Sequence, residues 1–143
     1  MEVSTNSPPP YEGGCACGAV RYRITARTVG SRVCHCRNCQ KVMAGPVLAH
    51  AQFPKEAVTW TGQTNRWQSS ERLFRHFCGT CGTNLFLEPQ DGPRIGVPLA
   101  TLDDPEAISP ELHYWRDSGV SWVSVPIEVP VLPGGTSEPY RKG

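Results

Sequence analysis

Seven cysteines fall in three short groups along the chain. Their spacings are Cys-x-Cys, Cys-x-Cys-x-x-Cys and Cys-x-x-Cys, and they occupy positions Cys15, Cys17, Cys34, Cys36, Cys39, Cys78 and Cys81. Such spacings let neighbouring thiolates bind one metal ion, and zinc takes four tetrahedral ligands of this kind. One Cys-x-x-Cys pair is weak evidence, but three groups that use every cysteine are strong. Buried cysteines that serve only as small apolar residues would explain this clustering poorly.

The cysteine count indicates how the ligands divide between ions. Two all-cysteine sites would need eight thiolates, and the chain has seven. The natural division is a three-cysteine cluster, which can surround one ion locally, and a four-cysteine cluster, which closes another. Closed four-thiolate zinc sites are structural, whereas three protein ligands leave a position for water or substrate, as catalytic zinc requires. The three-cysteine cluster is Cys34, Cys36 and Cys39, and the four-cysteine cluster is Cys15, Cys17, Cys78 and Cys81.

A histidine is an alternative fourth ligand for the three-cysteine cluster. Three cysteines and one histidine form a common structural zinc set. Spacing alone does not separate this closed site from an open one, so both interpretations stand at this point. The candidates are His35, His50, His76 and His113.

Basic residues concentrate around the three-cysteine cluster. The segment from Arg21 to Arg75 contains ten Lys and Arg residues and only two acidic ones. The segment from Thr83 to Tyr140 contains nine acidic residues and only two arginines. These cations either offset the negative charge of metal–thiolate groups or bind an anionic ligand. The net charge is only +1, which gives no overall electrostatic case for nucleic acid or an anionic membrane as partner.

The remaining sequence favours a mainly β fold. Gly and Pro together make up 28 of 143 residues, which is typical of short strands joined by many turns. Segment 19–25 alternates, with Val20, Tyr22 and Ile24 on one face and Arg21 and Arg23 on the other, as in a half-buried strand. We predict a short helix over 37–43 and further strands over 47–53, 57–60, 71–77, 84–88, 94–98 and 122–129.

Two of these strands define a hairpin, because 71–77 leads into Cys78 and 84–88 leads away from Cys81, which places metal ligands at the hairpin tip. We expect a disordered tail over 1–11, a zinc-binding domain over 12–132 and a flexible tail over 133–143. The sequence has no apolar run of about 20 residues and no signal peptide at its start. We therefore expect a cytoplasmic protein with reduced thiols.

Three segments resemble one known family. GGCACGAVRYRI, CHCRNCQKVMAGP and RHFCGTCGTNLF look like the signatures of the glutathione-dependent formaldehyde-activating enzyme family, which includes the domain of centromere protein V. The likeness extends to TLDDPEAI and to His113, Trp115 and Trp122. The resemblance implies a β-tent fold with two zinc ions, one structural in the four-cysteine cluster and one open and catalytic in the three-cysteine cluster. It also implies carbon–sulfur lyase chemistry on adducts such as S-hydroxymethyl-glutathione.

Several residues outside the clusters bear on that chemistry. His50 stands where the family usually has an aromatic residue, and we expect an exposed histidine at a sheet edge rather than a ligand or proton shuttle. Large aromatic side chains are usually buried, so we expect Trp115 and Trp122 in the core rather than in the wall of a pocket. Glutathione carries carboxylates, and their candidate partners are Arg32, Arg37, Lys41 and Arg66.

The sequence thus predicts a zinc-dependent carbon–sulfur lyase that acts on a small thiol adduct, with glutathione as the model thiol and neither nucleic acid nor membrane as partner. Zinc held by three thiolates is a soft Lewis acid that can bind a further sulfur while a neighbouring bond is made or broken. The alternative is a non-enzymatic zinc module that binds protein or nucleic acid through the basic stretch 21–75. Salt-sensitive retention on heparin distinguishes the two.

Overall fold

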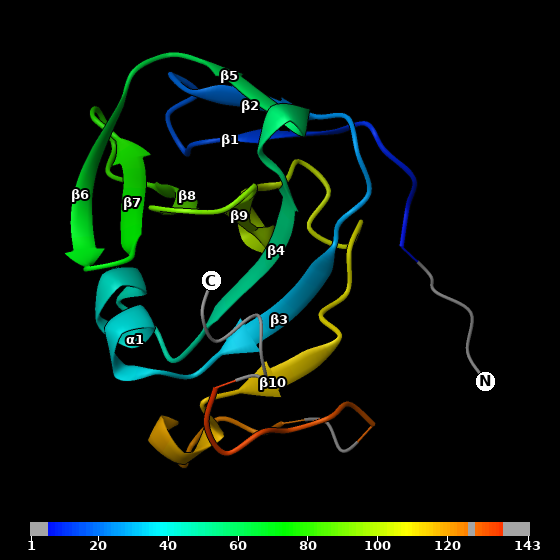
Figure 1. The fold of residues 1–143 in the computed structure, drawn as a ribbon, viewed down its shortest axis with the longest axis vertical. Coiled ribbons are helices and arrows are strands. Elements are labelled where there is room, and N and C mark those ends of the chain that lie inside the picture. The colour runs from blue at the N-terminus through cyan, green and yellow to red at the C-terminus, as the bar shows by residue number, and fades with distance from the viewer. Residues whose placement is uncertain (1–5, 126–127, 136–143) are drawn as a thin grey trace.

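The computed structural model describes residues 6–125 and 128–135, and it confirms the mainly β prediction. The strands form two sheets (Figure 1). The small sheet has the order β1-β2-β5, and the large sheet has the order β10-β3-β4-β9-β8-β7-β6, in which every neighbouring pair is antiparallel except β10 and β3. The bounds are β1 Tyr11–Gly14, β2 Arg21–Ile24, β3 Gly30–Cys34, β4 Leu48–Pro54, β5 Val58–Thr61, β6 Thr64–Ser70, β7 Leu73–Cys78, β8 Asn84–Pro89, β9 Arg94–Pro98 and β10 Leu112–Tyr114.

The described ranges contain a single α-helix, α1, which spans Arg37–Met43 as predicted. It ends because Ala44 adopts a left-handed conformation immediately before Gly45 and Pro46. Figure 1 shows α1 close to the turn between β6 and β7. No helix in these ranges is long and apolar enough to cross a membrane. Three short 3₁₀ helices complete the structure, η1 Lys55–Ala57, η2 Leu99–Thr101 and η3 Arg116–Ser118.

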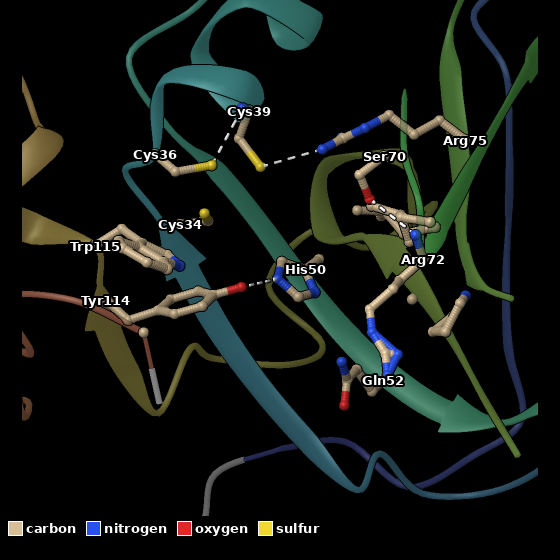
Figure 2. A pocket seen from close by; sticks show the side chains of 15 residues that line it. Cys34, Cys36, Cys39, His50, Gln52, Ser70, Arg72, Arg75, Tyr114 and Trp115 are labelled. Atoms are coloured by element: carbon tan, nitrogen blue, oxygen red, sulfur yellow. Dashed lines mark hydrogen bonds between the residues drawn. The ribbon is translucent and has the colours of Figure 1, made fainter. Parts of the chain in front are cut away.

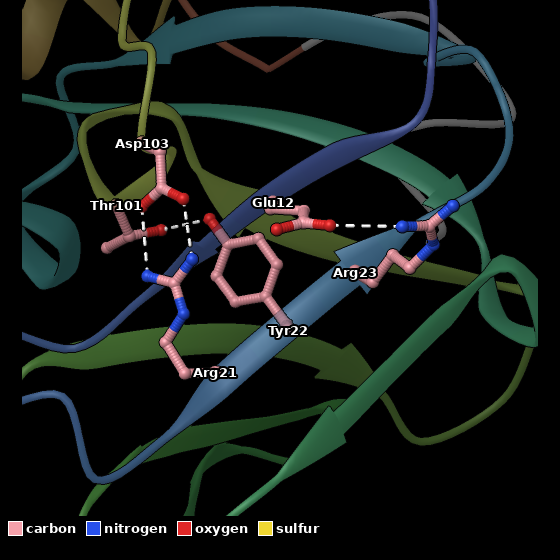
Figure 3. A network of polar contacts seen from close by, with 6 residues as sticks. All are labelled: Glu12, Arg21, Tyr22, Arg23, Thr101 and Asp103. Atoms are coloured by element: carbon pink, nitrogen blue, oxygen red, sulfur yellow. Dashed lines mark hydrogen bonds and ion pairs between the residues drawn. The ribbon is translucent and has the colours of Figure 1, made fainter.

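Strand β2 has the predicted alternation of buried and exposed side chains. Tyr22 and Ile24 are buried, while Arg21 and Arg23 face solvent. The two arginines pair with carboxylates: Arg21 binds Asp103 through two hydrogen bonds, and Arg23 binds Glu12 at 3.0 Å (Figure 3). Exposed pairs of this kind contribute little stability, so we assign the strand's stability to its buried face.

The main core packs side chains of the small sheet against those of the large sheet. Phe53, Phe86, Ile24 and Leu85 are among its largest fully buried members. Burial of one such side chain stabilises the fold by roughly 1.5–3 kcal/mol. The core thereby holds the two sheets in the arrangement that brings the N-terminal cysteines to the β7–β8 hairpin.

Several segments differ from the sequence predictions. Strands β1, β3, β6 and β10 were not predicted, because they are short or, in β6, almost wholly polar. The strand predicted over 122–129 is wrong for the described residues, which form turns, while 126–127 lie outside the described ranges. Residues 6–11, expected in a disordered tail, are ordered: Tyr11 begins β1, and its hydroxyl donates to the Ser7 carbonyl at 2.7 Å. In the expected C-terminal tail, Gly134 accepts a backbone hydrogen bond from Trp115 at 2.9 Å.

Candidate metal centres

The structure brings the four-cysteine cluster together at the tip of the predicted hairpin. Its four sulfur atoms lie within 4.8 Å of one another. The Sγ atoms of Cys15 and Cys17 are 3.6 Å apart, and those of Cys17 and Cys78 are 3.8 Å apart. Tetrahedral zinc with Zn–S bonds of about 2.3 Å requires S···S distances of about 3.8 Å. The cluster therefore fits a zinc ion as it stands.

Two turns of similar design present these thiols. In the first, the Gly18 N–H donates to the Cys15 carbonyl at 3.1 Å, and in the second the Gly82 N–H donates to the Cys78 carbonyl at 2.9 Å. Both glycines have left-handed backbones, with φ of 84° and 81°, a conformation that residues with a Cβ rarely adopt. The glycine that follows each Cys pair therefore closes the turn.

Backbone and hydroxyl donors surround the sulfur atoms of this cluster. The Val20 N–H lies 3.2 Å from the Cys15 Sγ, and the Thr80 N–H lies 3.3 Å from the Cys78 Sγ. Hydrogen bonds from the Thr83 hydroxyl and N–H lower the pKa of Cys81 to about 5. Donors of this kind favour the thiolate form that binds metal.

The three-cysteine cluster forms where β3 passes into α1. Cys34 ends the strand, Cys36 caps the helix by accepting a hydrogen bond from the Cys39 N–H, and Cys39 lies in the first turn. Their sulfur atoms also lie within 4.8 Å of one another. Hydrogen bonds from Cys34 and Cys39 lower the pKa of Cys36 to about 2, which makes it the first of the three to ionise. All seven cysteines are free of disulfide bonds.

No histidine completes the three-cysteine cluster. All four histidines are described, and none has a ring nitrogen within 4.8 Å of all three sulfur atoms. His35 and His113 instead bond each other at 2.9 Å, and His76 bonds Glu88 at 2.8 Å. The closed site with three cysteines and one histidine therefore has no fourth ligand in this geometry.

A cavity of about 300 Å³ lies beside the three-cysteine cluster (Figure 2). All three cysteines line it, whereas no member of the four-cysteine cluster does. Its volume is at the lower end of the range for small-molecule sites. Among the residues that the structure describes, its wall contains no Asp or Glu, and its polar members include His50, Gln52, Arg72, Arg75 and Tyr114.

Arg75 is a buried cation in this wall, with a relative exposure of 6%. Its Nη2 atom lies 3.7 Å from the Cys39 Sγ, and its Nε donates to the Ser69 hydroxyl at 3.0 Å. No carboxylate of the described residues forms an ion pair with it. A buried charge is stable only with a compensating partner, and the thiolates are the compensating groups here. This contact supports the interpretation that basic residues offset metal–thiolate charge.

The prediction of an exposed, edge-strand His50 is wrong. β4 is an interior strand, because β3 and β9 pair with its two edges. The His50 side chain is only 3% exposed, and its ring lines the cavity. Its Nε2 lies 3.2 Å from the Tyr114 hydroxyl. Burial, together with the charges of Arg32 and Arg75, lowers the pKa of His50 to about 3. The ring is therefore neutral at pH 7.

The expectations for the two tryptophans and for the four candidate cationic residues are also corrected. Trp115 and Trp122 are 40% and 72% exposed rather than in the core, and Trp115 forms part of the cavity wall. Among the described residues, the arginines that line the cavity are Arg72 and Arg75, which come from the β6–β7 hairpin. They were missed because this hairpin comes to lie beside the cysteines through the pairing of β9 with both β8 and the distant β4. None of the four residues predicted to bind the carboxylates of glutathione lines the cavity: Arg32, Arg37, Lys41 and Arg66.

The comparison with family models agrees with this geometry. The model of the glutathione-dependent formaldehyde-activating enzyme matches residues 10–118. The chain belongs to this family. The match includes both cysteine clusters and ends beyond Trp115, so it contains nearly the whole cavity wall.

Two relatives and one solved structure are similar to the chain. A lyase of Schizosaccharomyces pombe, itself uncharacterised, is 30% identical to this chain over 84 residues. The aligned region covers 59% of this chain and 61% of the relative, so the chain spans less than two thirds of the relative's length. A Halomonas elongata protein that carries the family's name is 26% identical over 125 residues, 80% of each chain. A Rhodobacter sphaeroides protein of known crystal structure has a TM-score of 0.52 at 22% identity, covering 84% of this chain and 98% of its own, and so shares the fold.

Proposed function

We propose that this family member is a zinc-dependent carbon–sulfur lyase that acts on a small thiol adduct such as S-hydroxymethyl-glutathione. The observation that carries the proposal is the three-cysteine cluster, whose thiols open onto a small-molecule cavity with no histidine to close the metal site. The family and the relatives named for lyase and formaldehyde-activating function support it.

Two zinc ions have different roles in this proposal. The four-cysteine cluster supplies a complete ligand set away from the cavity, which suits an ion that stabilises the fold. The three-cysteine cluster supplies three ligands within the cavity, which suits an ion that binds substrate. Cys34, Cys36 and Cys39 are then the catalytic metal ligands, and Cys15, Cys17, Cys78 and Cys81 are the structural ones.

The zinc ion would supply a position where the substrate sulfur is held and stabilised as a thiolate. When the adduct breaks, the electron pair of the C–S bond stays with sulfur, the hydroxyl oxygen becomes the aldehyde oxygen, and the hydroxyl proton ends on the thiol that is released. The Tyr114 hydroxyl is placed to hydrogen bond to that oxygen, and the neutral His50 ring at 3.2 Å orients it. Arg75 offsets the negative charge that accumulates on the sulfur atoms.

The test is the formation and breakdown of a thiol–aldehyde adduct by the zinc-loaded protein, followed by NMR with formaldehyde and glutathione. We expect catalysis in the wild type and none in Cys36→Ser. Cys36→Ser should still contain one zinc ion and unfold cooperatively, so that its loss of catalysis is not explained by a loss of folding. A zinc-loaded wild type that accelerates neither direction, and that heparin retains in a salt-sensitive way, would replace the lyase proposal with the binding module.

A further inference from the structure

Trp115 has a strained backbone at the edge of the cavity. Its φ of 58° and ψ of 34° lie in the left-handed region, which bulky residues adopt only at a cost in free energy. Among the described residues other than glycine, only Ala44, at the end of α1, shares a positive φ with it. Such strain persists where the surrounding structure imposes it, and it is concentrated at functional sites.

The left-handed conformation determines where the indole points. Trp115 follows directly after β10, and successive side chains of a strand point to opposite faces. Tyr114 and Trp115 nevertheless both line the cavity, and Figure 2 shows both rings pointing into it from the same side. The turn at Trp115 therefore adds a second aromatic ring to the wall that contains the three cysteines.

The segment 130–135, which we call the 130–135 strap, fixes this turn. Five backbone hydrogen bonds of 2.9–3.0 Å connect residues 130–134 with residues 113–117. One of them runs from the N–H of the strained Trp115 to the Gly134 carbonyl. The strap lies outside residues 10–118, which the family model matches, so the family match does not account for it.

Gly135 lies against the indole and is part of the cavity wall. A Cβ at this position would meet the Cζ2 atom of Trp115 at 3.1 Å, which is closer than an ordinary van der Waals contact. A Cβ at Gly134 would meet the Cζ3 atom of the same ring at 3.8 Å, which is an ordinary contact. A side chain at position 135 would therefore displace the ring or the strap, whereas one at position 134 would not.

We propose that Trp115 is a positioning residue, which the 130–135 strap holds as a cover over the open metal position of the three-cysteine cluster. The indole is 40% exposed, so it separates solvent from the cavity that it lines. An apolar cover excludes water from the sulfur at the metal and contacts the carbon beside it. This inference rests on the proposed function, because the substrate sulfur must bind at that cluster. The cover acts on any thiol, whatever groups the thiol carries at its far end.

The experiment measures thiol binding to cobalt-substituted protein, whose absorption reports sulfur ligation at the metal. The probe is mercaptoethanol, which has no charged group. We expect Trp115→Ala to bind it about tenfold more weakly than the wild type, because contact with an aromatic ring is lost. Trp115→Phe keeps a ring and should bind it nearly as well as the wild type. Both variants should have the cobalt content of the wild type, so that weaker binding is not explained by loss of the metal.

Gly135→Ala and Gly134→Ala are a matched pair that tests the strap. We expect Gly135→Ala to weaken thiol binding about threefold, because a small displacement of a positioning group is costly. Gly134→Ala should bind the thiol as the wild type does. Trp115→Gly should be more resistant to denaturant than Trp115→Ala, the reverse of the usual order, because glycine adopts the left-handed conformation without strain.

Wild-type affinity in a folded, cobalt-loaded Trp115→Ala would overturn the positioning role and leave the lyase proposal intact. Equal affinities of Gly134→Ala and Gly135→Ala would overturn the role of the strap. Wild-type cobalt bands that respond to no thiol would overturn the lyase proposal, and this inference with it. If Trp115→Ala does not fold, the two glycine variants decide, because both keep the indole.

Discussion

The Arg75 guanidinium points at the Cys39 sulfur from the neighbouring hairpin, with 3.7 Å between the Nη2 and Sγ atoms. The contact joins β7 to α1 across 36 positions of sequence. Arg75 is buried, and no carboxylate within residues 6–125 and 128–135 pairs with it, so its charge and that of the three-cysteine cluster stabilise each other.

Replacement of this arginine should weaken metal binding at the three-cysteine cluster. In Arg75→Gln we expect zinc affinity at one of the two sites to fall about tenfold or more, because a charged hydrogen bond to thiolate is lost. Competition with a chromogenic chelator measures this, and Arg94→Gln should behave as the wild type. Unchanged affinities at both sites in Arg75→Gln would show that the contact does not stabilise the metal-bound state.

Loss of one ligand should have different consequences in the two clusters. Wild-type protein purified without chelator should contain two zinc ions per chain, and the variants are compared with it. Cys78→Ser should lose cooperative folding, because a closed four-thiolate site contributes directly to the free energy of folding. Cys39→Ser should remain folded with one zinc ion. Elemental analysis and thermal melts test both variants, and a folded Cys78→Ser beside an unfolded Cys39→Ser would reverse the two roles.

The glycines that close the cysteine turns offer a test of backbone strain. A Cβ at Gly18 or Gly82 meets no atom within 4 Å, so substitution changes only the cost of the left-handed conformation. We expect Gly18→Ala and Gly82→Ala each to lower the free energy of unfolding by about 1–2 kcal/mol. Gly45→Ala is the control, because Gly45 lacks the positive φ and its Cβ would meet the nearest atom at 3.8 Å. Denaturant unfolding at saturating zinc measures all three.

His50 should make stability depend on pH. Its pKa is about 3 in the folded protein and about 6.5 in the unfolded chain, so between these values the unfolded state binds more protons. Stability from this residue is therefore lost as pH falls, by about 1 kcal/mol from pH 6.5 to 5.5. His50→Gln should lack this loss while the contributions of other groups remain. Equal slopes of unfolding free energy against pH for the two proteins would contradict the assignment.

The sequence by itself determined the features that depend on neighbouring residues. Cysteine spacing separated the two clusters, the alternation in 19–25 gave the buried face of β2, and Gly45 and Pro46 marked the end of α1. The position of Cys78 and Cys81 at a hairpin tip could be predicted because β7 and β8 are adjacent in the chain. These features depend on turn chemistry and side-chain period, which are local properties. The β-tent assignment, the domain boundaries and the cytoplasmic location stay predictions.

The tertiary structure alone decided what surrounds the three-cysteine cluster. His50 lies on an interior strand because β9, about 40 positions or more further along the chain, pairs with one edge of β4 while β3 pairs with the other, and its ring is buried beside Tyr114 from β10. Arg72 and Arg75 reach the cavity because β9 pairs with both β8 and the distant β4, which places their hairpin beside the three-cysteine cluster, whereas the arginines nearest the cysteines in sequence do not line it. Strand order in a sheet depends on the burial of a common core by distant segments, so no local pattern encodes it. The two cysteine clusters could be predicted from spacing, whereas the cavity that the three-cysteine cluster faces depends on the packing of distant strands.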